Sequence, residues 1–149
     1  MGCTQDDREW MARAISLAAT HLGTTGANPS VGCILVRDGN SVGEAVTGPG
    51  GRPHAEEQAL ALAGNLAQGS TAYVTLEPCA RRSTDAPSCS ERLIAAGVTC
   101  VLIACQDPSI NAAGQGIARL RRAGIQVQTG LLDDQAKGLY ANYKPAGSA

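Results

Sequence analysis

Four side chains in the middle of the chain have the residue types and spacing of a metal-assisted catalytic site. His54 and Glu56 lie two positions apart, and Cys79 and Cys89 follow further along. An imidazole and two thiolates are suitable ligands for Zn²⁺, and three protein ligands leave the fourth position of the ion open for water. Zinc lowers the pKa of that water toward neutrality. The spacing therefore indicates a catalytic zinc site, with Glu56 placed to carry protons.

The order of these residues agrees only in part with a known pattern of zinc chemistry. His-x-Glu followed by Pro-Cys-x-x-Cys is typical of zinc-dependent nucleobase deaminases, in which the glutamate is not a ligand. Here Pro78 precedes Cys79, but nine residues separate Cys79 from Cys89. The chemistry therefore matches, whereas the second spacing does not.

Each of the four residues also has a structural interpretation. A histidine at a helix start is commonly a surface residue, a first-turn glutamate commonly interacts with the helix dipole, and two cysteines ten positions apart are commonly unrelated. Their coincidence at predicted element ends on one side of a sheet favours a zinc site. A purely structural site has no use for a carboxylate that is not a ligand, so Glu56 favours catalysis.

Composition limits the remaining classes of function. The 149 residues are 44% hydrophobic and 17% charged, which predicts one globular domain over residues 1–149. A net charge of −1 and 3% aromatic residues disfavour a nucleic-acid partner. No apolar stretch approaches the roughly 18 residues of a membrane span, and the first residues do not resemble a signal peptide. We therefore expect a cytoplasmic protein that acts on a small molecule.

Two further groups of residues have ordinary explanations. Cys33, Cys100 and Cys105 lie in apolar runs, where a free thiol behaves as a small hydrophobic side chain, so we expect reduced core cysteines. The stretch 114–116 has two glycines, but it lacks the preceding strand and the third glycine of a phosphate-binding loop. We therefore expect a turn there.

Hydrophobic periodicity and turn residues predict alternating helices and strands. Asp6 or Asp7 can cap a first helix, and Asp38-Gly39-Asn40 is a favourable hairpin turn. The expected helices cover about residues 6–22, 54–66, 89–97 and 113–123, with a last one from about 133. The expected strands cover about residues 31–36, 41–45, 71–76, 98–105 and 125–128. This alternation predicts a three-layer α/β domain.

The expected helix starts explain how distant residues could form one site. His54 begins one helix, and Ser88 with Glu91 forms a capping box that makes Cys89 the first residue of another. Exposed N–H groups at a helix start favour anionic ligands and lower the pKa of a thiol. In the first helical turn, His54 and Glu56 can flank one point beyond the helix end. Ala55 leaves room there and a free N–H toward a bound ring.

Several longer motifs resemble one family. They are residues 28–32 (Asn-Pro-Ser-Val-Gly), 51–56 (Gly-Arg-Pro-His-Ala-Glu), 75–79 (Thr-Leu-Glu-Pro-Cys), 93–98, 106–108 (Gln-Asp-Pro) and 116–125. Together they resemble the deaminase domain of the bifunctional riboflavin biosynthesis deaminase/reductase, here as a stand-alone domain, over about residues 8–143. The resemblance implies the cytidine deaminase-like fold, an α-β-α arrangement with a mixed five-stranded sheet. It also implies a homodimer or homotetramer and a long loop between the two cysteines.

The resemblance also suggests substrate contacts, and some of these positions differ from the family. Asn28, Thr47, Ala55, Arg81, Arg82, Asp107 and Ser109 are the expected substrate-binding residues. The family typically has histidine at Thr47, Ser-His at Ala80-Arg81 and asparagine at Ser109, and its inter-cysteine loop is about one residue shorter. Several simultaneous changes in polar contacts are expected to redirect specificity. As turn formers before proline, Asn28 and Asp107 also have a purely structural interpretation.

The sequence therefore predicts a zinc-dependent hydrolytic deaminase of a small aminated pyrimidine or related heterocycle. The diaminopyrimidine intermediate of riboflavin synthesis is one candidate substrate. Arg81 and Arg82 could clamp a phosphate, or they could be solvated loop charges. Two other hypotheses stay open, namely a deaminase of tRNA or another polynucleotide and a zinc-stabilised binding module without turnover.

Overall fold

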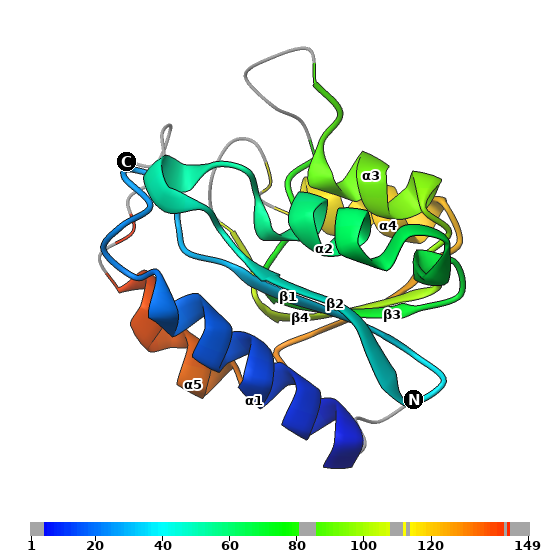
Figure 1. Cartoon of the computed structure of the whole chain (residues 1–149), viewed down its shortest axis with the longest axis horizontal. Helices are drawn as coiled ribbons and strands as arrows, with labels where there is room; N and C mark the ends of the chain where they lie inside the picture. The colour runs from blue at the N-terminus through cyan, green and yellow to red at the C-terminus, as the bar shows by residue number, and fades with distance from the viewer. Residues whose placement is uncertain (1–4, 81–85, 108–111, 113, 142, 144–149) are drawn as a thin grey trace.

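A mixed five-stranded sheet forms the centre of the molecule (Figure 1). The computed structural model describes residues 5–80, 86–107, 112, 114–141 and 143. The strands are β1 (Gly32–Arg37), β2 (Asn40–Val46), β3 (Thr71–Leu76), β4 (Cys100–Cys105) and β5 (Gln126–Thr129), in the sheet order β2-β1-β3-β4-β5. The expected three-layer α/β fold with a mixed sheet is confirmed.

The sheet has an antiparallel half and a parallel half. β1 is antiparallel to both β2 and β3, with Cys33 opposite Val74. β3, β4 and β5 are parallel to one another. The expected hairpin joins β1 to β2, and its residues Asp38 and Gly39 have φ values of 53° and 79°. Two successive positive φ values are typical of the tight turns that suit the twist of a hairpin.

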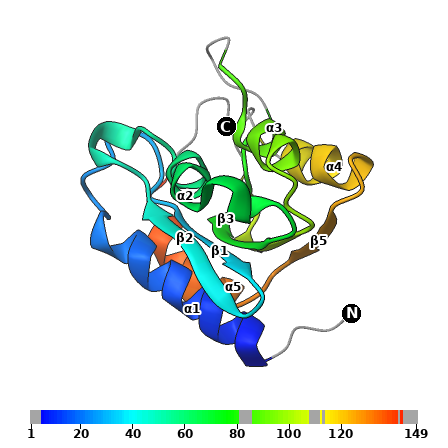
Figure 2. The ribbon, with the colours of Figure 1, turned by 45° about the vertical axis from the view of Figure 1, so that its right-hand side comes forward.

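Helices cover both faces of the sheet (Figure 2). The α-helices are α1 (Gln5–Thr20), α2 (Ala55–Ala63), α3 (Cys89–Ala95), α4 (Gln115–Arg122) and α5 (Asp133–Ala136). Short 3₁₀ turns are η1 (Pro49–Gly51), η2 (Gly64–Ala67) and η3 (Lys137–Tyr140). α2, α3 and α4 lie on one face, and α1 and α5 lie on the other. Within the described ranges, no helix is long and apolar enough to cross a membrane.

The central strands are apolar because helices bury both of their faces. Val74 and Ile103 belong to the core under α2, α3 and α4, whereas Ile34 and Leu102 pack with Met11 of α1 on the opposite face. The two cores are separate layers. The sheet therefore holds the carboxyl ends of β3 and β4 firmly at one edge, where the next segments begin.

One glycine lets α2 lie directly on the sheet. A Cβ atom at Gly43 of β2 would lie 2.3 Å from the carbonyl oxygen of Ala59 in α2. No real Cβ atom approaches an oxygen so closely, so a larger residue would displace the helix. α2 begins directly after His54, and the close contact at Gly43 therefore contributes to the position of the site.

The structure corrects several details of the sequence prediction. α2 ends at Ala63, because Gly64 has a positive φ of 55° and starts a 3₁₀ turn. Asp6 and Asp7 lie inside the first turn of α1 and not before it. Gly116 is inside α4, so only Gly114 takes the turn-like conformation expected for both glycines.

The cysteine prediction was right for pairing and partly wrong for burial. None of the five cysteines in the described ranges forms a disulfide. Cys33 is fully buried, and burial raises the pKa of its thiol. Cys100 and Cys105 are only half-buried, because they are the first and last residues of β4 and lie at the rims of the sheet.

Candidate metal centre

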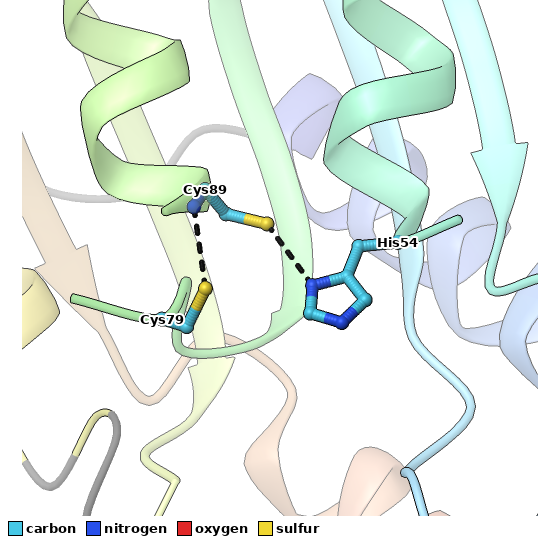
Figure 3. Close-up of side chains that lie close together, drawn as sticks. All are labelled: His54, Cys79 and Cys89. Carbon is cyan, nitrogen blue, oxygen red and sulfur yellow. Dashed lines mark hydrogen bonds between the residues drawn. The ribbon is translucent and has the colours of Figure 1, made fainter. Parts of the chain in front are cut away.

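Three side chains from separate elements point toward one another on the α2 and α3 face of the sheet (Figure 3). His54, Cys79 and Cys89 bring their ligand atoms to within 4.8 Å of one another. The Nδ1 atom of His54 lies 3.3 Å from the Sγ atom of Cys89. Such a group is close enough to bind a single ion.

His54 reaches this point from the start of α2. Its backbone is extended, with φ −68° and ψ 155°, and the helix begins at the next residue. The side-chain amide of Gln58 in α2 donates hydrogen bonds through Nε2 to the backbone oxygens of Val46 and Pro53, at 2.8 and 3.0 Å. These bonds tie the segment before His54 to the helix that follows it. The backbone that carries the imidazole is therefore held on both sides of His54.

The two cysteines are held by the start of α3. Ser88 is the N-cap of this helix, and its hydroxyl accepts a hydrogen bond from Glu91 N at 3.2 Å, as the capping box predicted. The N–H of Cys89 donates to Cys79 Sγ at 3.2 Å. The N–H of Ser90 donates to the backbone oxygen of Cys79 at 3.0 Å. The first turn of α3 thus positions both thiols.

The surroundings of Cys79 favour its thiolate. Hydrogen bonding from Cys89 is the largest influence and lowers the pKa of Cys79 to about 4, with His54 acting in the same direction. Burial opposes this shift. Because the thiolate is the form that binds metal, Cys79 is prepared to act as a ligand at neutral pH.

Glu56 is buried beside the cluster and has an unusual acidity. The residue is 4% exposed. Burial raises the pKa of its carboxyl group from 4.5 to about 7; the charge of His54 opposes this, and that of Cys79 adds to it. A carboxyl group with a pKa near the working pH can both accept and donate a proton, as general acid–base catalysis requires.

The donor set fits zinc. One histidine nitrogen and two cysteine sulfurs are ligands that Zn²⁺ binds in tetrahedral sites, and they do not suit Mg²⁺ or Ca²⁺, which prefer oxygen. Three protein ligands would leave the fourth coordination position of a zinc ion open. Glu56 lies beside the cluster and is not required as a ligand.

Comparison with known proteins agrees with this donor set. Residues 4–105 match the cytidine and deoxycytidylate deaminase zinc-binding region. The chain belongs to this zinc-binding deaminase family. Zn²⁺ is accordingly its cofactor, in agreement with the cluster.

Relatives and solved structures narrow the branch of the deaminase family. The chain is 49% identical over 133 residues to the riboflavin biosynthesis protein RibD of Escherichia coli K12, covering 89% of this chain and 36% of that protein. It is 44% identical over 132 residues to a diaminohydroxyphosphoribosylamino-pyrimidine deaminase of Buchnera aphidicola from Acyrthosiphon pisum, covering 89% of each. The RibD structure of Acinetobacter baumannii matches with a TM-score of 0.88 and 45% identity, over 93% of this chain and 39% of that one.

These comparisons confirm the expected branch and fold. The chain spans about a third of the length of its RibD relatives and most of the length of the Buchnera relative. The riboflavin-type deaminase domain is therefore the correct comparison for the rest of the site.

The expected substrate contacts of this deaminase domain lie in different surroundings. Asn28 is exposed, and its amide nitrogen donates to the backbone oxygen of Gly51 at 3.3 Å, in the segment that leads to His54. Thr47 is buried, and its hydroxyl accepts from Val31 N at 2.8 Å. Asp107 is 8% exposed and lies two residues after the carboxyl end of β4. Their contact with substrate stays a prediction.

One of the other expected contacts lies beside the predicted proton carrier. Ala55 is fully buried in the first turn of α2, next to Glu56. Arg81, Arg82 and Ser109 lie outside the described residues. Their roles stay predictions as well.

Two tyrosines that the sequence analysis did not single out lie against this region. The hydroxyl of Tyr143 donates to the Asp107 carboxylate at 3.3 Å, and Tyr143 lines a pocket of 270 Å³ together with Asn28. The Tyr140 hydroxyl donates to the backbone oxygen of Ser30 at 2.9 Å and is 2.7 Å from the hydroxyl of Thr75. No local motif marks them, because their partners lie far away in the sequence.

Proposed function

We propose that this domain is a zinc-dependent hydrolase that removes an exocyclic amine from an aminated pyrimidine of the diaminohydroxyphosphoribosylamino-pyrimidine class. The Buchnera relative carries this substrate in its name and matches almost end to end. The observation that carries the proposal is the buried Glu56 carboxyl beside converging His54, Cys79 and Cys89. A site that only stabilises the fold would not require that carboxyl group.

In this proposal each residue has a separate chemical task. His54, Cys79 and Cys89 hold the ion, which when bound supplies a water made acidic enough to attack at neutral pH. Glu56 accepts a proton from the attacking water and donates it to the ring nitrogen beside the amine-bearing carbon. Glu56 then helps to protonate the departing amine. Overall a C–O bond replaces a C–N bond, one water is consumed and one ammonia is released.

The proposed substrate contacts allow a change of specificity within this class. The hydroxyl of Thr47 already accepts a hydrogen bond from the backbone of Val31, so its role in this proposal is to position the strand ends beside the site. Arg81 and Arg82 can bind a phosphate bidentately. If they do, replacing both with alanine raises KM for the phosphorylated substrate and leaves KM for its dephosphorylated form unchanged.

The decisive experiment measures ammonia release from a panel of compounds. The panel contains the phosphoribosylated diaminopyrimidine, its dephosphorylated form, cytosine, cytidine, deoxycytidylate, a pteridine and single-stranded RNA. We expect the largest kcat/KM for the diaminopyrimidines. Preferred turnover of RNA would favour a polynucleotide deaminase, and zinc binding without turnover of any compound would favour a binding module.

We further propose that residues 1–149 form one domain that is cytoplasmic and assembles as a homodimer or homotetramer. Leu62 of α2 is 67% exposed and Leu66 of the following turn is 51% exposed, which supports an apolar contact surface on that side. Light scattering during size-exclusion chromatography tests the assembly, and a monomeric mass at micromolar concentration would contradict it.

A further inference from the structure

Glu77 is a buried carboxylate that is neither a zinc ligand nor part of the proposed proton transfer. The residue directly follows β3 and is 3% exposed. Its backbone N–H donates to the oxygen of Cys105 at 2.9 Å, which extends the pairing of β3 with β4. Burying a carboxylate is costly unless polar groups compensate. Its hydrogen-bond partners therefore indicate what Glu77 holds in place.

The Glu77 side chain accepts three backbone N–H groups from a later part of the chain. Its Oε1 atom accepts from Asp107 at 3.3 Å and from Gly114 at 3.1 Å, and its Oε2 atom accepts from Ile117 at 3.3 Å. The N-cap of α4 is Gly114, which has no side chain to bond the first turn. Glu77 satisfies N–H groups that a helix start leaves unpaired.

A second contact joins the same two segments. A Cβ atom at Gly116 would lie 2.0 Å from the carbonyl oxygen of Pro78 and 3.3 Å from Oε2 of Glu77. The first turn of α4 therefore rests directly on the backbone between Glu77 and Cys79. Pro78 is fully buried in this contact.

Cys79 is thus held between two helices. On one side its Sγ and backbone oxygen accept N–H groups from the start of α3. On the other side, the two residues before it are fixed to the start of α4. The helices themselves approach each other, with Arg119 and Glu91 forming an ion pair at 3.8 Å.

We infer that Glu77 is a positioning residue for the zinc ligand Cys79. By fixing the segment before Cys79 to α4, Glu77 sets the position of the thiolate relative to His54 and Cys89 before metal binds. The inference rests on the zinc site and not on which amine the domain removes. It is therefore tested on the metal alone, without substrate.

The test separates positioning from simple stabilisation of the fold. The variant is Glu77→Gln, which keeps the size of the side chain but removes its charge and points an amide donor at one of the N–H groups. Two controls accompany it. Glu44→Gln removes the charge of a β2 carboxylate that pairs with Arg13 of α1 and accepts a hydrogen bond from Ser41. Ile34→Val lowers the stability of the fold by a change in the core on the α1 face of the sheet.

Zinc affinity is measured by competition with a chromophoric chelator, and the visible spectrum is recorded after cobalt substitution. We expect Glu77→Gln to bind zinc about tenfold more weakly, at the lower end of what loss of a ligand-orienting partner costs. Its cobalt spectrum is expected to shift, whereas both controls match the parent. Unchanged zinc affinity and cobalt spectrum in folded Glu77→Gln would overturn the inference, even if its melting temperature falls.

A glycine pair keeps the test decisive if Glu77→Gln does not fold. Gly116→Ala pushes the carbonyl of Pro78 from the α4 side, whereas Gly138→Ala meets nothing within 4 Å and serves as its control. We expect weaker zinc binding only for Gly116→Ala. Equal zinc affinity in the two alanine variants would contradict the inference independently of Glu77.

Discussion

The metal side and the substrate side of the site are supported by different kinds of structure. On the metal side, His54 and Cys89 stand at the starts of α2 and α3, and Cys79 is bonded to the first turn of α3. Backbone geometry therefore sets the ligand positions.

On the substrate side, the described expected contacts other than Ala55 lie in connecting segments. Asn28 bonds to the backbone of Gly51, and Asp107 bonds to Tyr143. Side chains in such segments can be replaced without moving a helix. This difference predicts that substitutions on the substrate side change the substrate preference while the zinc chemistry is kept. The departures from the family at Thr47, Arg81 and Ser109 all fall among the expected substrate contacts.

The largest expected effect is the removal of a ligand from the metal side. Cys79→Ser replaces a thiolate with a hydroxyl that binds zinc poorly, so zinc affinity should fall by more than about 100-fold, beyond the loss typical of residues bonded to a ligand. Activity should be abolished. Zinc content after dialysis checks this, with the half-buried thiol variant Cys105→Ser as control. Stoichiometric zinc in Cys79→Ser would show that the cluster is not the metal site.

Removing the proton carrier should be the next largest effect. Glu56→Gln should retain zinc and lose about 10² to 10⁴ in kcat, because general acid–base catalysis is typically worth that factor. Glu57→Gln is the matched control, since Glu57 is the next residue of α2 and pairs with Arg92 at 3.8 Å. Kinetics and zinc content are measured on the same samples. Near-normal turnover by Glu56→Gln would remove the assigned role.

A third effect concerns pH and the zinc-free protein. Burial raises the pKa of Glu56 from 4.5 to about 7, so the folded state holds this proton more tightly than the unfolded chain. That contribution is complete below pH 4.5 and is lost as pH rises through 7. Glu56→Gln stays neutral at every pH. Without zinc, the variant should therefore match the parent near pH 4.5 and exceed it at pH 8, by at most roughly 3 kcal/mol.

Chelator-treated samples melted between pH 4.5 and 8 give this comparison. The lowered pKa of Cys79 acts in the opposite direction, with stability lost toward acid, but that thiol is present in both proteins. A melting-temperature difference that is constant across the range would show that Glu56 does not titrate there.

The smallest effects are expected on the substrate side. Asp107→Asn should raise KM about tenfold, since a hydrogen bond to a charged group is typically worth roughly 1.5–3 kcal/mol, while zinc content stays normal. Tyr143→Phe keeps the ring and removes only the hydroxyl that bonds Asp107, so it should change KM by a few-fold. Steady-state kinetics on the preferred substrate check both. Zinc loss in either variant would break the separation between the two sides.

The sequence was sufficient for the parts of this molecule that local patterns determine. Ser88 and Glu91 predicted the start of α3, and the turn at Asp38 and Gly39 predicted the hairpin. The motifs around His54 and Cys79 indicated the family, which the comparisons confirm.

The parts that were missed depend on partners distant in sequence. Glu77 accepts hydrogen bonds from the N–H groups of Asp107, Gly114 and Ile117. The residues around Glu77 in the sequence do not predict these partners. The glycines at 114 and 116 predict a turn, because the sequence does not show that Pro78 lies against Gly116. The apolar run of β4 predicts core cysteines at both of its ends, because such a run does not reveal which residues reach the rim of the sheet.

The topology of the mixed sheet places the zinc ligands on both of its halves. His54 follows the β1–β2 hairpin, whereas Cys79 and Cys89 lie between β3 and β4, so the ligands come from opposite sides of the seam where β1 pairs with β3. An ion bound by all three ligands would link the segments on the two sides of the β1–β3 pairing. Because a ligand that binds only the closed form suppresses opening, zinc should slow amide hydrogen exchange along β1 and β3 more than along β5. The metal would then hold together the two halves of the sheet as well as supply the chemistry.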